Sequence, residues 1–558
     1  MSSRGPDAAM VMVLVRGSAC DVCRKRKRRC DAKKPACTSC IKAKSPAQCK
    51  YAGLGTRKKS AGLLRNLEES VDELESRISF LAAESRESNS EAQTIICPAS
   101  ARPACIPPRV APRIVHRSAV SSPMSDPYQD SWVHQQDIPS QIQEPLIQAF
   151  LKFRWHFGIQ WNIPRFLASL KLPTTHPDAP HPAFLNAVLL HGAFFCSTSL
   201  KRYEHVFYRR MSRELALSLE KGDRLFDFIR ASILAGCYLY GTSRLSEAYT
   251  RVSSTMNFAV ACGFHEISSP SLDTRFYMIP PCVDAIELGD RISTFWILFK
   301  SDRAGSLLLG HPCTLADDEI TTILPYPSST YATGDYLYQP METIASMYDP
   351  YATMASASVS HYEALRAKST ALLHRACVLA ARAKGATVVG NTLRQEISRA
   401  TMASIKFADS LPAFYAQDPE FEDSTTARST LAPVYIATYA TVIQILDILP
   451  DENPSYRPRQ AQAARSAMSI VKELQDAPFG YIPLLLGWAL TPVHAFMVRK
   501  EMRYKKSGDK KNATAVQDEI KVLISTMLRV RELFPKPGVI QIDVLEKNAS
   551  ALRLIELA

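Results

Sequence analysis

Six cysteines lie within the first fifty residues, and their regular spacing suits metal binding. They form two CxxC pairs, and each pair is followed at a distance by a third cysteine. The six are Cys20, Cys23, Cys30, Cys37, Cys40 and Cys49. Thiolates at such intervals favour tetrahedral zinc in a closed, structural site that has no open position for water or substrate. Two tetrahedral zinc ions need eight ligand positions, which six sulfurs supply only if two of them bridge both ions.

An unbroken basic run, residues 24–29, fills the gap between the second and third cysteines. Residues 20–60 contain fourteen Lys and Arg against two Asp, so this window carries +12 of the net charge of +13. A strongly basic module beside a nearly neutral remainder indicates that a polyanion binds at one end of the chain. Lys and Arg side chains can read the O6 and N7 acceptors of guanine in the major groove. The alternative for any single member of the run is a solvated charge or part of a nuclear import signal.

The residues around the cysteines extend the pattern. Asp21 follows the first cysteine, Lys27 lies within the basic run, and Pro35 stands two residues before the fourth cysteine. This pattern resembles the fungal zinc binuclear-cluster family of transcription factors. The resemblance implies a cofactor of two zinc ions held by the six cysteines, with Cys20 and Cys37 bridging the ions. Spacing alone does not select those two.

The same resemblance implies roles in binding double-stranded DNA. Lys27 lies where the family's main base-reading lysine falls, with Arg26 beside it, which implies recognition of a CGG-type triplet. Other basic residues would contact mainly phosphates, which position the module without carrying sequence information. These are Arg24, Arg29, Lys42 and Lys44.

The zinc module is predicted to occupy residues 18–52, and its two halves repeat loosely at an offset of seventeen residues. A coiled-coil segment is predicted at 60–86, where apolar residues alternate by three and four. The heptad positions are Leu64, Leu67, Val71, Leu74, Ile78 and Leu81. A seam with β-branched residues at a and Leu at d favours a parallel two-stranded coil, so we expect a homodimer through residues 64–81. The alternative is a single amphipathic helix packed on the rest of the chain.

Residues 87–140 are rich in Ser, Pro, Ala and Arg and are predicted to form a flexible, disordered linker. From about residue 141 the apolar residues recur with helical spacing, and convincing alternating strands are absent. We therefore expect a small zinc-stabilised module and a short coiled coil, followed by a large all-α body. This body divides into a regulatory middle domain at 141–450 and a C-terminal helical region at 451–558. Helices are expected near 203–220, 226–241, 246–262, 362–384, 391–409, 460–475 and 514–533.

The body also resembles the helical middle domain of the same family. The matching residues are 259–265, 287–303, 310–312 and 324–325. Asp290 stands where the family usually has the first of two adjacent arginines, so any role of that arginine is not carried over. His265 is expected to be a helix-end or core histidine, and Asp302 and Arg303 to form an ion-pair network near a helix end, rather than catalytic groups.

The rest of the chain argues against secretion and against a membrane span. The apolar run at 10–15 is shorter than the ~7–15 residues of a signal-peptide core, and the eight remaining cysteines lie singly, as buried thiols in a reducing compartment do. The most apolar segment, 481–498, contains Pro483, Gly487 and Pro492. It is therefore predicted to be a buried helix pair broken by prolines.

These features favour a nuclear, sequence-specific, DNA-binding transcription factor whose helical body responds to a small-molecule effector, the transcription machinery or self-inhibition. An enzyme is the second hypothesis, but the sequence has no Walker loop, HExxH, GxSxG or strand-linked GxGxxG, so we expect no enzymatic activity. A metal-buffering or redox protein is the third hypothesis. It leaves the basic run and some 500 further residues without a purpose.

Overall fold

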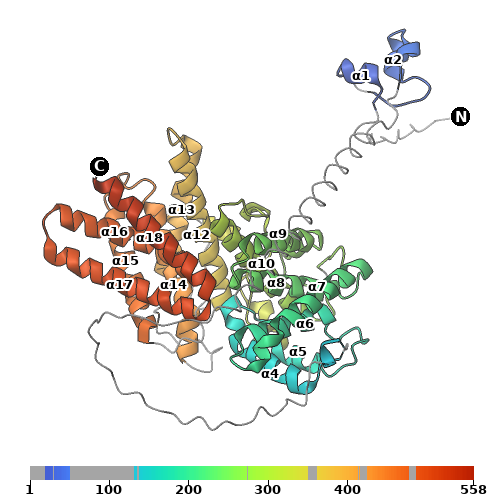
Figure 1. The fold of residues 1–558 in the computed structure, drawn as a ribbon. Coiled ribbons are helices and arrows are strands. Elements are labelled where there is room, and N and C mark those ends of the chain that lie inside the picture. Colours follow the sequence, from blue (N-terminus) through green and yellow to red (C-terminus); the bar gives the residue numbers. More distant parts are fainter. Residues whose placement is uncertain are drawn as a thin grey trace, which may run out of the picture. The chain divides into compact units, whose positions relative to one another are not determined.

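The computed structural model describes residues 19–28, 30–50, 131–134, 137–272, 274–349, 361–412, 414, 424–476 and 486–557. Every regular element within these ranges is a helix, which confirms the predicted cysteine-rich module and helical body. The chain divides into two compact units, Met1–Pro123 and Met124–Ala558, and each is described by itself (Figure 1). The predicted coiled coil at 60–86 and most of the predicted linker at 87–140 lie outside the described residues.

The described part of the first unit contains three short helices. They are α1 (Asp21–Lys25), α2 (Thr38–Lys42) and the 3-10 helix η1 (Pro46–Gln48). None is longer than five residues, and isolated helices of this length are unstable in water. The fold of this unit therefore depends on what its cysteines bind.

The second unit is a helical body in which long helices alternate with short 3-10 turns. Its α-helices are α4 (Ser140–Phe153), α5 (Ile163–Ser169), α6 (Pro182–Phe195), α7 (Glu204–Lys221), α8 (Leu225–Gly241), α9 (Leu245–Ala261), α10 (Ala285–Leu309), α11 (Ser328–Thr333), α12 (Tyr362–Gly385), α13 (Asn391–Ser410), α14 (Ser424–Leu446), α15 (Tyr456–Asp476), α16 (Leu486–Lys506), α17 (Lys510–Leu533) and α18 (Pro535–Leu557). Its 3-10 helices are η3 (Ser131–His134), η4 (Arg154–Phe157), η5 (Ser199–Tyr203), η6 (Phe264–Glu266), η7 (Asp317–Glu319), η8 (Asp335–Tyr338) and η9 (Ala345–Tyr348).

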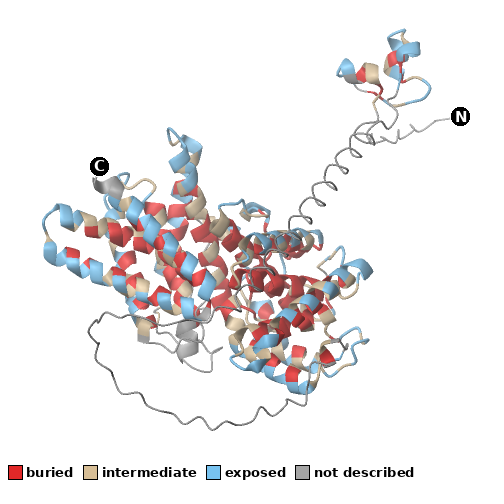
Figure 2. Cartoon of the chain, viewed as in Figure 1, coloured by how far each residue is buried: buried red, intermediate tan, exposed pale blue. Residues whose placement is uncertain are grey.

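Helix α10 is the central helix of the first half of the body and is buried on nearly all sides (Figure 2). It begins where the Asp284 carboxylate accepts a hydrogen bond from the Glu287 amide at 2.8 Å, and it ends at Gly310, whose φ is +68°. It packs against α8, α9, α11 and α12. Its fully buried apolar residues include Ile292, Phe295, Trp296 and Phe299.

The expected ion-pair network near the end of α10 is present. Arg303 donates to Asp302 at 2.8 Å and to Asp317 at 2.7 Å, and the Asp302 carboxylate accepts from the Thr314 hydroxyl at 2.6 Å. Asp302 and Arg303 are both 0% exposed. These bonds attach the loop that follows α10 to the helix itself, so this pair has a structural role.

The second half of the body is built around α14, which packs against α12, α13, α15 and α16, while α16 also contacts α17 and α18. The prediction of a proline-broken helix pair at 481–498 is wrong for its described part, because α16 runs unbroken through Pro492. A proline removes one backbone hydrogen bond, and burial against α14, α17 and α18 keeps the helix continuous despite that loss. Among the described helices, none is both long and apolar enough to cross a bilayer.

Candidate metal centre and nucleic-acid interface

Each CxxC pair opens one of the two short helices of the first unit. The Cys20 sulfur accepts a hydrogen bond from the Cys23 amide at 3.4 Å, and the Cys37 sulfur accepts one from the Cys40 amide at 3.4 Å. The first cysteine of each pair therefore occupies the place of a helix N-cap. Amide donors and the positive end of a short helix favour the thiolate form that metal binding requires.

The structure brings all six sulfurs together into two overlapping groups of four. One group is Cys20, Cys23, Cys30 and Cys37, and the other is Cys20, Cys37, Cys40 and Cys49; within each group the sulfurs lie within 4.8 Å of one another. All six side chains are buried. The two groups share two sulfurs, which is the arrangement that eight ligand positions from six cysteines require.

The sulfur spacing fits zinc. A tetrahedral site with Zn–S bonds of about 2.3 Å has sulfur–sulfur edges of about 3.8 Å. The Sγ–Sγ distances in the structure are 3.8 Å for Cys20 to Cys37, 3.8 Å for Cys20 to Cys40 and 3.6 Å for Cys23 to Cys37. The donor set is all thiolate, a type that Zn²⁺ accepts in closed structural sites.

Little else in the module could hold it together. Among the hydrophobic residues that the structure describes, only Ala19, Val22 and Ala36 pack against the sulfurs. Burial raises the pKa of the Cys37 and Cys40 thiols, because a thiolate is poorly solvated there. Divalent cations would offset this cost, so metal binding and folding should be coupled in this unit.

Loop contacts that were not anticipated from the sequence support α2. The Asp31 carboxylate accepts a hydrogen bond from the Thr38 amide at 3.0 Å and another from the Thr38 hydroxyl, and these bonds lower the pKa of Asp31. The peptide bond between Lys34 and Pro35 is cis. An acidic residue seven positions before a helix start is a weak sequence signal, because the loop between them has to fold back to bring the two together.

The two halves of the module repeat in detail at the predicted offset of seventeen residues. Each residue of α1 corresponds to the residue of α2 that lies seventeen positions later in the chain. Each ends in the same way, with Lys27 at φ +49° and Lys44 at φ +53°, both in the left-handed region. The next amide then closes the turn, Arg28 onto the Cys23 carbonyl and Ser45 onto the Cys40 carbonyl, both at 3.0 Å.

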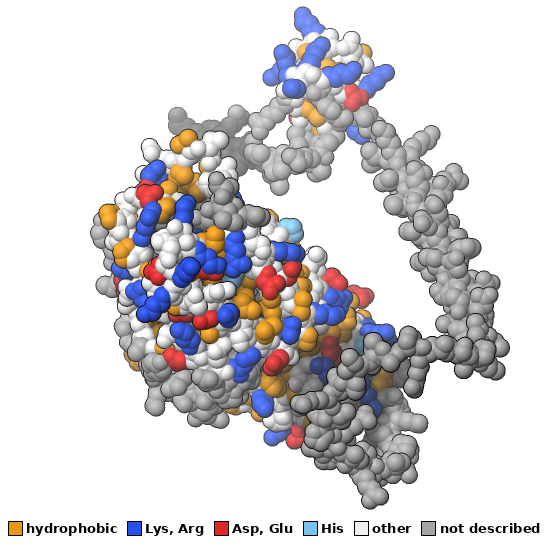
Figure 3. All heavy atoms as spheres, turned by 60° about the vertical axis from the view of Figure 1, so that its left-hand side comes forward, with side chains coloured by type: hydrophobic (Ala, Val, Ile, Leu, Met, Phe, Trp, Pro, Cys, Tyr) orange, Lys and Arg blue, Asp and Glu red, His pale blue; other side chains and the backbone are white. Residues whose placement is uncertain are grey.

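The basic residues of the first half lie at the end of α1 and beyond it. Arg26 and Lys27 are exposed, as are Lys42 and Lys44 at the end of α2. Lys and Arg side chains project from much of the visible surface of this module (Figure 3). Arg29 and the side chain of Arg24 fall outside what the structure describes. Because six thiolates and two Zn²⁺ sum to −2, the basic residues outweigh the cluster.

In the body, the departure at Asp290 corresponds to a buried carboxylate. Asp290 accepts a hydrogen bond from the Asn162 amide at 2.8 Å, and burial raises the pKa of Asp290 to about 6. Arg291 pairs with Glu287 one turn earlier, and its guanidinium lies 4.3 Å from the Phe276 ring centroid. Both residues thus contribute to the packing of α10.

Comparisons with known proteins match both parts of the chain. Residues 18–58 match the fungal Zn(2)-Cys(6) binuclear cluster domain, and residues 147–344 match the fungal specific transcription factor domain. An uncharacterized transcriptional regulatory protein of Schizosaccharomyces pombe is 32% identical over 98 residues, which is 17% of this chain and 11% of that protein. The chain thus spans about a tenth of the length of this curated relative. No solved structure gives a significant match.

The family resemblance expected from the sequence is confirmed by these matches. The cluster domain is one that binds two zinc ions, and the six buried sulfurs have the number and spacing to hold them. The chain therefore carries a segment that matches the fungal Zn(2)-Cys(6) binuclear cluster domain, followed by a segment that matches the fungal specific transcription factor domain.

Proposed function

We propose that this chain is a nuclear transcription factor that reads CGG-type triplets in double-stranded DNA through its zinc module. Cys20, Cys23, Cys30, Cys37, Cys40 and Cys49 are the proposed ligands, with Cys20 and Cys37 bridging. The observation that carries the proposal is the pair of four-sulfur groups that share these two residues, directly beside the exposed basic end of α1. Two bound zinc ions would supply the rigidity that short helices lack.

Lys27 and Arg26 are the proposed base-reading residues. Both are exposed where α1 ends, and a short basic helix end is narrow enough to enter the major groove, about 12 Å wide. Arg24, Arg29, Lys42 and Lys44 would contact phosphates. If each module neutralises ~4 phosphates, a dimer should show a slope near −7 in log K against log salt.

A homodimer through residues 64–81 is part of the proposal. Two modules on a coiled coil would bind two half-sites, with spacing set by the chain between Cys49 and Leu64. Sedimentation of the full chain should give a dimer, and Leu74→Asp should give a monomer that binds one half-site. A monomeric wild-type chain would contradict this part of the proposal.

The test of DNA reading is selection of bound sites from random DNA by the full, zinc-loaded chain. The wild type should enrich CGG-type triplets. Lys27→Ala and Lys27→Gly should both lose the guanine preference, and the glycine variant keeps the backbone free to adopt φ +49°. Lys50→Ala, at another exposed position of the module, should weaken binding without changing the selected sequence. Unchanged selection by both Lys27 variants would refute the assignment.

The helical body is proposed to regulate DNA binding or transcription without catalysing a reaction. The absence of catalytic motifs from the sequence and the structural role of the Asp302–Arg303 pair support this part. Turnover of a substrate by the full chain would contradict it.

A further inference from the structure

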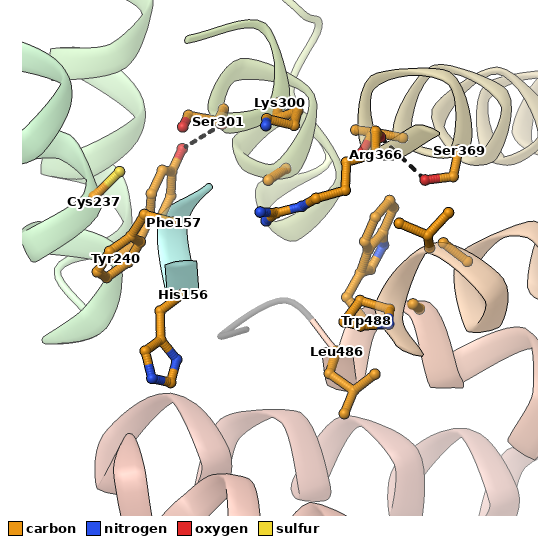
Figure 4. A pocket seen from close by; sticks show the side chains of 16 residues that line it. His156, Phe157, Cys237, Tyr240, Lys300, Ser301, Arg366, Ser369, Leu486 and Trp488 are labelled. Carbon is orange, nitrogen blue, oxygen red and sulfur yellow. Dashed lines mark hydrogen bonds between the residues drawn. The ribbon is translucent and has the colours of Figure 1, made fainter. Parts of the chain in front are cut away.

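A cavity of about 90 Å³ lies inside the helical body, where six elements from both halves meet. Its walls come from η4, α8, α10, α12, α14 and α16, so it joins the segment matched as a transcription factor domain to the C-terminal helices. Figure 4 shows Arg366 reaching from α12 toward the space between Tyr240 and Trp488. No part of the zinc module contributes to it.

Two buried cations at this cavity share one carboxylate. Lys300 pairs with Glu363, and Arg366 donates to the same carboxylate from one terminal nitrogen at 2.9 Å. The side chains of Lys300 and Glu363 are 8% and 3% exposed, and that of Arg366 is 13% exposed. The cluster therefore carries one positive charge without a matching anion. Burial and the Arg366 charge lower the pKa of Lys300 well below its usual value, because nothing nearby among the described residues balances this excess charge; an anion bound beside the cluster would stabilise the charged form of Lys300.

Gly158 shows how closely the backbone approaches this cluster. It ends η4 with φ +67°, and a Cβ there would lie 2.4 Å from Arg366 Nη1 and 2.9 Å from Lys300 Nζ. The absence of a side chain at this position lets both cations lie beside the carboxylate. The cluster is therefore held in place on one side by backbone, and its other side is the cavity.

Several hydrogen-bond donors that line the cavity have no acceptor among the described residues. Arg366 bonds only through Nη1, which leaves Nε and Nη2 free, and neither the Trp488 indole nor the Thr370 hydroxyl has a bond in that part of the chain. The remaining lining is largely apolar: Phe157, Tyr240, Ala304, Pro433, Val434, Ala437, Leu486 and Ala489. Free donors and an excess cation within apolar walls suit a ligand with one anionic end and a short hydrocarbon part.

We propose that this cavity binds a small aliphatic monocarboxylate, with its carboxylate on Arg366 and its chain against the apolar walls. A guanidinium can hold a carboxylate through two parallel N–H donors, and Arg366 has two free. A cavity of ~150 Å³ holds benzene, so about 90 Å³ encloses roughly four heavy atoms. Four heavy atoms correspond to a carboxylate group and the carbon attached to it. The rest of the hydrocarbon chain would extend toward the open side of the cavity. The proposal concerns ligand binding and is independent of DNA reading.

Butyrate is the probe, titrated calorimetrically into the full, zinc-loaded chain. We expect saturable binding at one site, with a dissociation constant of about 1 mM for so few heavy atoms. Butyramide, which has the same shape but no charge, should bind at least tenfold more weakly. Arg366→Gln should weaken butyrate binding at least tenfold, whereas Arg382→Gln, on the same helix but at a half-exposed site paired with Glu396, should not change it.

Ala437→Leu provides a second variant that leaves every charge in place and fills the cavity from α14. It should abolish butyrate binding while the helical circular dichroism signal is unchanged. This variant therefore tests the proposed site even if Arg366→Gln does not fold. Absence of saturable binding by acetate, butyrate and hexanoate to the folded wild type would overturn the proposal. Equal binding of butyrate and butyramide, tighter binding of inorganic phosphate, or full butyrate binding by folded Arg366→Gln or Ala437→Leu would do so as well.

Discussion

The sharing of two sulfurs between the two four-sulfur groups predicts that cysteine substitutions fall into two classes. Cys30→Ser removes a sulfur from one group and leaves the other, which contains Cys40 and Cys49, complete. Cys37→Ser removes a sulfur from both groups. A change of one sulfur to oxygen should therefore affect one zinc ion in the first variant and both in the second.

The size of the effect follows from general zinc energetics. Structural zinc sites with four ligands bind with apparent free energies of about 10–16 kcal/mol, or about 3 kcal/mol per ligand, which corresponds to roughly a hundredfold in affinity. Cys30→Ser should keep one ion at wild-type affinity and hold the other about a hundredfold more weakly. Cys37→Ser should hold both ions about a hundredfold more weakly.

Chelator competition on the full chain, followed by elemental analysis, measures this directly. The wild type should release two equivalents together at high chelator concentration. Cys30→Ser should release one early and one late, and Cys37→Ser should release both early. The assignment of shared sulfurs would be refuted if Cys37→Ser retained one ion as tightly as the wild type. Loss of both ions together from Cys30→Ser would contradict the independence of the second group.

Three further predictions concern other parts of the molecule. Gly192→Ala should lower the free energy of unfolding by about 1–3 kcal/mol in denaturant melts, because its Cβ would lie 2.1 Å from a carbonyl oxygen of α4. Gly385→Ala is the control: no atom lies close to that position, so the substitution should be neutral or slightly stabilising. Burial lowers the pKa of His191 to about 4, so the stability present above pH 6.5 should fall as the pH drops toward 4, by about 2 kcal/mol at pH 5. His191→Gln should flatten this part of the plot of unfolding free energy against pH. An equally steep plot for the variant would show that other groups cause the dependence. Lys44→Ala should reduce the salt slope of DNA binding by about 1 per module without changing the selected triplet, and a changed triplet would show that it reads bases.

The sequence predicted the helical body well where apolar periodicity was strong. The stretches expected at 203–220, 226–241 and 391–409 agree with α7, α8 and α13 to within one residue at each end. In such helices one face is buried, so the spacing of apolar residues carries the information. The continuous helix through Pro492 was not predicted, because the burial that maintains it comes from segments distant in sequence.

The two candidate sites also differ in how well the sequence predicts them. The six cysteines were evident because metal ligands cluster at short, regular intervals along the chain. The cavity around Arg366 was not found, since its walls come from residues between 156 and 489 and no local pattern joins them. The excess charge at the cavity arises because Lys300 of α10 and Arg366 of α12 pair with the same carboxylate, that of Glu363. Only the folded structure brings these two helices together.

Because the zinc module repeats internally, either of its two halves offers a similar basic surface to a DNA duplex. The two helix ends share the same turn-closing hydrogen bond, and each has a lysine with positive φ at the same point of the turn. Their difference lies in the neighbours: Arg26 and Arg28 flank one lysine, whereas Ala43 and Ser45 flank the other. In the proposed mode of DNA binding these arginines favour the first half facing the bases. Exchanging them between the halves should therefore weaken this preference and change the orientation of the triplet that the module selects.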